Sequence, residues 1–223
     1  HLSLRRQRQM CIRDRPGPGY SPYSPSDRRW LDPLQVSLPQ VLPDAANSVL
    51  GGDEALAAAV EAGTAARRID WPHSAAVKWR WIRQVRQWVA AQAPSQHAQI
   101  ETWRAMQGDP LRHYCQHAAD RFTGSADDHA FAQWLAQQGW AQVHATLRDE
   151  GASIGLIADL AVGCAPQGVE ARTGGADLLQ GLELGAPPDA FNPLGQAWGI
   201  TSWSPMALLR EGFALSLIHI SEP

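Results

Sequence analysis

Polar side chains gather around one tryptophan near the end of the sequence. Asp189, Asn192, Gln196 and Trp198 fall within ten residues of a Gly- and Pro-rich stretch, GAPPDAFNPLGQAWG. The apolar face of a sugar ring stacks on an indole, while its hydroxyls pair with amides and carboxylates. Long loops inside compact domains often carry function. The stretch is therefore a candidate sugar site, although composition alone leaves a core role for Trp198 open.

A second candidate, Asp159, stands inside a short apolar run, SIGLIADLAV at 153–162. This run follows a helical pattern and predicts a strand buried on both faces, as in a parallel sheet. A carboxylate at the end of such a strand is costly unless it is paired or solvated. The carboxyl ends of the strands form the active face of an α/β barrel. Asp159 is thus either a functional residue or a structural aspartate that caps the following loop.

These candidates must be positioned by a mostly helical chain. Seven prolines within 16–44 predict short extended pieces and no helix there. A final helix is expected near 205–211, after the long loop at 185–199, and a helix followed by a buried strand and a loop is one α/β repeat. Apolar spacing predicts the earlier helices at 53–62, 72–92, 96–107, 109–122 and 127–149, the last capped by Asp127.

Composition excludes several classes of protein. With 19 Lys+Arg against 22 Asp+Glu, the net charge of −3 argues against a dedicated nucleic-acid binder. No apolar run approaches the roughly 20 residues of a membrane span. Three cysteines exclude a disulfide framework or a zinc knuckle. His113 and His117 share a helix face, but no third ligand accompanies them, so we expect neither a metal nor a cofactor.

Six segments between residues 20 and 214 carry motifs that follow one another in a characteristic order: SPYSPSDRRWLDPL, IDWPHSAAVKWRWIR, FAQWLAQQGWAQVHATLRDEGASIGL, IGLIADLAVG, LGAPPDAFNPLGQAWG and SPMALLREGF. Together these collinear segments resemble the 4-α-glucanotransferases of the amylomaltase type, in the α-amylase clan. Two departures from that family's pattern stand out: Asp27 replaces a serine, and Asp32 replaces the asparagine before Pro33.

The resemblance implies a fold and an activity. The fold is a partial (β/α)₈ TIM barrel with helical insertions, mostly helical in this stretch. The activity is transfer of α-1,4-glucan segments between maltooligosaccharides, by a retaining mechanism with two carboxylates about 5–5.5 Å apart. The implied partner is a maltooligosaccharide or α-1,4-glucan, with no cofactor, nucleic acid or membrane, and the implied compartment is the cytoplasm.

The resemblance also assigns residues, by position only. Tyr23 matches a sugar-contacting tyrosine in the SPY motif, although a packing role for Tyr23 stays open. Asp159 matches the first acidic residue of the clan's strand-end set, and Asp189, Gln196 and Trp198 match the loop that covers the bound sugars.

No catalytic carboxylate is assigned by the resemblance. The family nucleophile lies in an Arg-Ile-Asp-His strand that follows the REGF match, and the acid/base Glu and a third Asp come later still. Asp70, in an Arg-Ile-Asp run, matches instead a helix start in the family. The chain is therefore expected to bind substrate without cleaving it.

The two ends read differently from the rest. Residues 1–15, HLSLRRQRQMCIRDR, and 215–223, LSLIHISEP, resemble translations of a sequencing-library adapter in its two orientations. The expected organisation is then a Pro-rich start with helical insertions at 16–152, and a barrel strand with substrate loop and helix at 153–214. Such a chain is an internal fragment.

Two other functions stay open at this point. A helical protein-interaction module without sugar chemistry would show contiguous exposed aromatic side chains. A fragment of another α-amylase-clan enzyme, a hydrolase, would show the same strand and loop. A strand at 154–160 that runs into an ordered loop would favour an enzyme fragment over the module.

Overall fold

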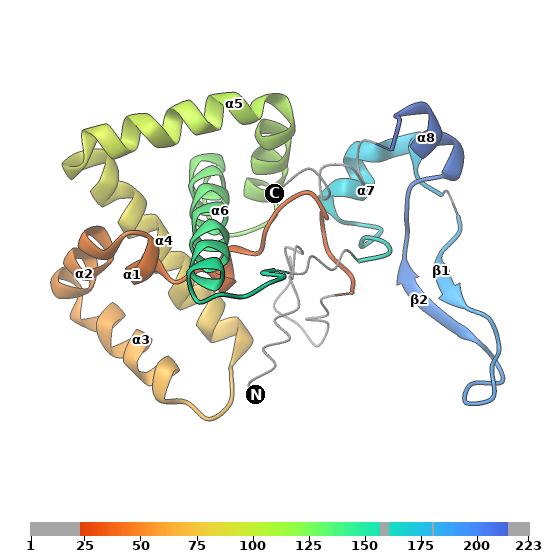
Figure 1. Ribbon diagram of the computed structural model, residues 1–223, viewed down its shortest axis with the longest axis horizontal. Helices are drawn as coiled ribbons and strands as arrows, with labels where there is room; N and C mark the ends of the chain where they lie inside the picture. The colour runs from red at the N-terminus through yellow and green to blue at the C-terminus, as the bar shows by residue number, and fades with distance from the viewer. Residues whose placement is uncertain (1–22, 157–160, 180, 214–223) are drawn as a thin grey trace. The chain divides into compact units, whose positions relative to one another are not determined.

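The computed structural model describes residues 23–156, 161–179 and 181–213, which fall into two compact units. The helical unit is Pro33–Ser153, and the hairpin unit comprises the described residues at 23–32 and 154–213. Figure 1 labels the elements of both units. The helical unit contains η1 (Pro33–Gln35), α1 (Leu38–Val41), α2 (Pro43–Gly52), α3 (Glu54–Ala65), α4 (Trp71–Gln92), α5 (Pro94–Ala119) and α6 (Ala126–Asp149); the hairpin unit contains α7 (Val169–Gly174), η2 (Gly175–Asp177), β1 (Leu184–Ala186), β2 (Gln196–Ile200) and α8 (Pro205–Arg210).

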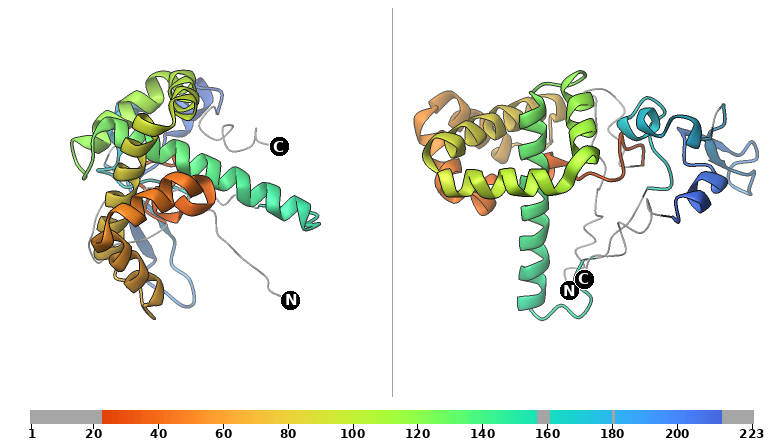
Figure 2. Two further views of the ribbon diagram at one scale, coloured as in Figure 1. Left: turned by 90° about the vertical axis from the view of Figure 1, so that its left-hand side faces the viewer. Right: turned by 90° about the horizontal axis from the view of Figure 1, so that it is seen from above.

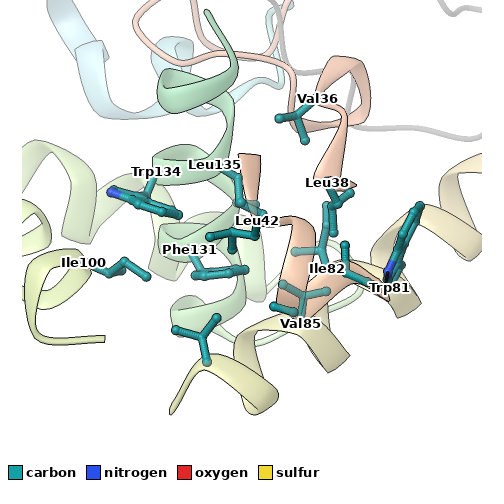
Figure 3. Packing of buried hydrophobic residues seen from close by; sticks show 14 of the residues in the cluster. Val36, Leu38, Leu42, Trp81, Ile82, Val85, Ile100, Phe131, Trp134 and Leu135 are labelled. Carbon is teal, nitrogen blue, oxygen red and sulfur yellow. Dashed lines mark hydrogen bonds between the residues drawn. The ribbon is translucent and has the colours of Figure 1, made fainter. Parts of the chain in front are cut away.

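One apolar core holds the helical unit together. Figure 3 shows Leu42 lying among Phe131 and Leu135 of α6 and Ile82 and Val85 of α4. Side chains of this kind form a continuous buried cluster, and burial of each aliphatic side chain is worth about 1.5–3 kcal/mol. Tryptophans contribute much of this core: Trp81 and Trp134 are buried in the cluster, and Trp79, Trp88 and Trp103 pack against it.

Side-chain caps fix where two of the long helices begin. Asp70 caps α4, because its Oδ1 accepts a hydrogen bond from His73 N at 3.1 Å, as its assignment to a helix start implied. The predicted cap of α6, Asp127, was wrong. Ser125 is the cap: its Oγ accepts from Asp128 N, and Asp128 Oδ2 accepts from Ser125 N at 2.8 Å, a reciprocal capping box.

Prolines mark helix starts in the region where they were expected to prevent helices. Pro39 lies in the first turn of α1, and Pro43 begins α2. A first-turn N–H has no acceptor within its own helix, so a proline there loses no hydrogen bond. The prediction of extended structure up to residue 44 was therefore wrong for its last part. The predicted break between two helices near 108 is confirmed, since Gly108 (φ 62°, ψ −147°) interrupts α5.

The hairpin unit differs more from expectation. The predicted loop at 185–199 pairs its two flanks as antiparallel strands, with Gly185 opposite Ala197 and Ala186 opposite Gln196. The short helix α7 was not predicted, whereas the final helix is confirmed as α8. Of the predicted strand at 153–162, residues 157–160 lie outside the described part, and the described residues on either side of them are bends and coil.

Helix α6 packs against the other helices of its unit mainly along its N-terminal half. Figure 2 shows the C-terminal half of α6 running clear of α4 and α5, and buried residues occur only in its N-terminal half, up to Ala136. In the part of the chain that the structure describes, no helix combines the length and apolar character that a membrane crossing requires.

Candidate functional site

The hairpin β1–β2 carries four of the residues that the sequence singled out, Asp189, Asn192, Gln196 and Trp198. Two glycines allow its strands and loop to close tightly. A Cβ on Gly185 would lie 2.0 Å from Gln196 O, and Gly195 (φ 71°) would place one 2.7 Å from Ala186 O. Both positions therefore exclude any other residue without backbone movement. Figure 1 shows the long connection between the two strands that results.

Asp189 shapes the loop of this hairpin with one of its two carboxylate oxygens. Asp189 Oδ1 accepts hydrogen bonds from Phe191 N at 2.8 Å and Asn192 N at 2.7 Å, while Asp189 N donates to Asn192 O at 3.1 Å. An aspartate that binds backbone N–H groups just ahead of it stabilises a turn. Its Oδ2 accepts no hydrogen bond from the described residues and is available to a ligand.

Gln196 and Trp198 lie together on β2. Residues two apart on a strand face the same side, and Trp198 Nε1 donates to Gln196 Oε1 at 3.0 Å. The indole of Trp198 is 45% exposed, so its face can be covered by a ligand. Phe191 and Leu194 in the adjoining loop are almost fully exposed. An amide, a carboxylate and exposed rings on one hairpin suit a molecule with both hydroxyls and apolar faces.

Tyr23 is exposed and precedes a segment that is entirely buried from Pro25 to Arg28. Backbone hydrogen bonds hold this segment, since Ser26 O accepts from Glu170 N at 3.0 Å. The approach is so close that a Cβ on Gly168 would lie 2.4 Å from Ser26 O. The segment that carries Tyr23 is thereby fixed to the start of α7.

Sequence reasoning missed a buried group of charges next to this contact. Arg28 and Glu170, with side chains 7% and 0% exposed, form an ion pair in which Arg28 Nε lies 3.0 and 3.1 Å from the two carboxylate oxygens. Arg28 N and Trp203 Nε1 donate to the same carboxylate at 2.9 and 3.0 Å. Although burial opposes ionisation, these hydrogen bonds and the charge of Arg28 hold the pKa of Glu170 below its ordinary value.

A second pair stands beside the first. Asp27, fully buried, accepts from Arg29 Nε at 2.9 Å, and Arg29 Nη2 also donates to Thr173 Oγ1 at 3.1 Å. Burial raises the pKa of Asp27 despite its hydrogen bonds from Arg29. Burial thus opposes ionisation of both neighbouring carboxylates, but the net shifts of their pKa values are opposite, because only at Glu170 do the hydrogen bonds and the charge of the paired arginine outweigh burial.

Asp159 lies outside the described residues. The backbone is described again from Ala161 onward, and Arg28 Nη1 donates to the carbonyl oxygens of Ala161 and Val162 at 3.3 and 3.2 Å. The structure therefore ties the Tyr23 segment to residues 161–162, and joins Gln196 to Trp198.

The helical unit holds a hollow of about 250 Å³ between α4, α5 and α6. Its arginines are already paired, Arg104 with Asp127 at 2.8 Å and Arg86 with Asp128 at 2.6 Å. None of the residues predicted to bind substrate lines this hollow. No group of three or more potential metal ligands occurs among the described residues, and burial raises the pKa of the free thiols Cys115 and Cys164 to about 12.

Comparison with known proteins decides the family. A family model described as 4-alpha-glucanotransferase matches residues 7–127 and 116–217, which is most of the chain. The chain belongs to the 4-alpha-glucanotransferase family. The 4-alpha-glucanotransferase of Mycobacterium tuberculosis (strain ATCC 25618 / H37Rv) is 37% identical over 94 residues, which cover 42% of this chain and 13% of that protein. That of Haemophilus influenzae is 28% identical over 85 residues, 38% of this chain and 12% of that protein.

A solved structure extends the likeness from sequence to fold. Amylomaltase from Corynebacterium glutamicum superposes with a TM-score of 0.75 at 24% identity, over 92% of this chain and 32% of that one. The predicted fold class is confirmed in this sense: the chain has the fold of part of an amylomaltase. The chain thus spans about a third of that structure and about an eighth of the length of the curated relatives.

The family pattern offers a signal for only some of the missed residues. Arg28 lies within SPYSPSDRRWLDPL, one of the segments that carry the resemblance, so the resemblance could have marked it. The composition around Glu170 and Trp203 does not indicate a site. Glu170 gains its role from Arg28, which is 142 positions earlier in the sequence, and Trp203 gains its role from Glu170.

Proposed function

We propose that the protein to which this chain belongs transfers α-1,4-glucan segments between maltooligosaccharides by a retaining double displacement, and that this chain supplies part of the glucan-binding surface. The observation that carries the proposal is the hairpin of a 4-alpha-glucanotransferase family member that presents Trp198, Gln196 and Asp189 together. We also propose, from the resemblance, that the reaction takes place in the cytoplasm.

Each group has a part in holding an acceptor or donor sugar. The half-exposed indole of Trp198 offers an apolar face for stacking, and its bond to Gln196 holds the ring in place. Asp189 Oδ2 can accept from a sugar hydroxyl while Oδ1 maintains the turn. Tyr23 and Asp159 are assigned to the same substrate by their match to the family motifs. Transfer to a sugar rather than to water requires that the acceptor be held in place, which is the task of such groups.

Binding and catalysis are tested separately. Titration of this chain with maltoheptaose should quench or shift the signal of Trp198, and Trp198→Ala should weaken binding at least ten-fold, whereas Trp140→Ala on α6 serves as the matched control. Incubated with maltotriose, this chain should release no glucose. A full-length protein that carries the same sequence should convert maltotriose to glucose and longer glucans.

Three results would contradict the proposal. Unchanged affinity in Trp198→Ala would remove the hairpin as the sugar site. Glucose release by this chain would show that its own residues cleave the bond. A full-length protein without transfer activity would refute the reaction itself.

A further inference from the structure

We infer that Arg28, Glu170 and Trp203 form a positioning cluster, which holds the three glucan-binding segments of the hairpin unit on a common base. The inference rests on the proposed function, because it concerns the segments that carry Tyr23, Asp159 and Trp198. It assigns a role to three residues that contact no sugar in that proposal.

The carboxylate of Glu170 is saturated with donors, and this excludes it from proton transfer. Its Oε1 accepts from Arg28 Nε, Arg28 Nη2 and Trp203 Nε1, and its Oε2 accepts from Arg28 N and Nε. With no exposed surface, it can reach neither substrate nor water. An ionised, inaccessible carboxylate of this kind acts as a geometric anchor, because charge-assisted hydrogen bonds are both strong and directional.

The two residues that donate hydrogen bonds to Glu170 belong to different segments, and each segment also carries a predicted site residue. Arg28 lies five residues after Tyr23, and Trp203 five residues after Trp198. Arg28 Nη1 extends the cluster to the carbonyls of Ala161 and Val162, just after Asp159. One side chain, Glu170, therefore fixes the Tyr23 segment and the base of β2 directly, and fixes the segment after Asp159 through Arg28.

Backbone pairing supports the same base without replacing the cluster. Cys164 and Thr201 exchange two hydrogen bonds of 2.7 and 2.9 Å, which joins the chain beyond Asp159 to the end of β2. This bridge of two residues fixes where the two segments meet but allows one segment to rotate relative to the other. The planar Arg28–Glu170 pair and the indole of Trp203 fix the orientation of these segments as well.

The neighbouring pair provides an internal control. Asp27 is as buried as Glu170, and it stands where the family pattern has serine. Its partners are Arg29 of the same segment and, through Arg29, Thr173 of α7. It touches neither the segment after Asp159 nor β2 through any described hydrogen bond. Removal of its charge should therefore leave the glucan-binding segments in place.

The experiment uses this chain labelled with 5-fluorotryptophan, with the Trp198 and Trp203 resonances assigned from single Phe replacements. Maltoheptaose is titrated into wild type, Glu170→Gln and the matched control Asp27→Asn. We expect Glu170→Gln to shift the Trp203 resonance and to weaken the Trp198 response at least ten-fold, while Asp27→Asn stays within two-fold of wild type. Circular dichroism at 222 nm, which reports mainly on the helical unit, should be unchanged.

A milder variant keeps the test decisive if Glu170→Gln unfolds the hairpin unit. Trp203→Phe removes one indole donor and leaves the Arg28–Glu170 pair, so we expect about three-fold weaker binding with the Trp198 resonance still sharp. Wild-type affinity in both Glu170→Gln and Trp203→Phe would overturn the positioning role alone. Equal losses in Glu170→Gln and Asp27→Asn would also overturn it, since a general loss of structure would then explain both. A wild-type chain that gives no response to the sugar would refute the proposed function and this inference with it.

Discussion

The two units of this chain are stabilised by different physical means. The helical unit packs large apolar side chains from α1, α3, α4, α5 and α6 into one cluster. In the hairpin unit the described buried apolar residues are fewer, and its fully buried side chains include the carboxylates Glu170 and Asp27. Apolar burial is non-directional, but a hydrogen-bonded ion pair works only at one geometry. The unit expected to hold substrate is therefore stabilised by the interactions that depend more strongly on exact geometry.

We expect the largest loss of stability for Arg28→Ala, and only in the hairpin unit. This substitution leaves Glu170 buried without its cation, and loss of one partner of a buried pair costs about 3–5 kcal/mol. The hairpin unit should unfold or lose most of its stability, while ellipticity at 222 nm persists. Guanidinium denaturation followed by the fluorine signal of Trp203 measures this loss. Arg112→Ala, which breaks the exposed pair with Asp109, should leave the denaturation curve unchanged; an equal loss there would contradict the argument.

Leu135→Ala should have the opposite pattern. Leu135 is fully buried in α6, and removal of its methyl groups leaves a cavity that costs about 3 kcal/mol. The loss should appear in the helix signal at 222 nm and not in the Trp203 resonance. Leu182→Ala, at an exposed position of the hairpin unit, is the matched control. If Trp203 responded as strongly as the helices did, the two units would not be independent.

Mild acid should lower the stability of the helical unit alone, through protonation of His129. This side chain is buried against Trp79, with ring centroids 4.8 Å apart, and burial lowers its pKa to about 4 even though Asp128 favours the cation. The unfolded chain binds a proton near pH 6.5, so stability is present above that pH and is lost as the pH falls toward 4. At pH 5 the helical unit should have lost about 2 kcal/mol.

The hairpin unit should not follow in that window. Glu170 has a lowered pKa and stays ionised, and the raised pKa of Asp27 favours the folded form as the pH falls. Thermal unfolding at pH 7 and pH 5, with His129→Gln as the control that removes the titration, measures the difference. A pH dependence that survives in His129→Gln would contradict this assignment.

The smallest expected effect concerns the capping box of α6. Ser125→Ala removes the Oγ that accepts from Asp128 N, at a cost of about 1 kcal/mol. Asp127→Ala, the cap predicted from sequence, should have the smaller effect, because Asp127 pairs with Arg104 on the surface. Comparison of the two midpoints in guanidinium shows which residue begins the helix, and the reverse order would contradict the assignment of Ser125.

Sequence predicted the helical unit better than the hairpin unit, for a physical reason. Spacings of three and four, such as Trp81, Val85 and Trp88, depend only on near neighbours and correctly indicated α4. The errors there were local as well, since the chain uses Pro39 and Pro43 to start helices. The pairing of Gly185 with Ala197 and the pairing of Arg28 with Glu170 depend on contacts across the chain, which no local pattern contains.

The long sequence separation within the Arg28–Glu170 pair also has a consequence in time. At about 5–20 residues per second, a ribosome adds the 142 residues between the two partners in about 7–30 s. Throughout that interval the Arg28 segment has been made and its carboxylate partner has not, and all the helices from α1 to α6 are synthesised within it. During synthesis, the helical unit can therefore form before Arg28 has its carboxylate partner.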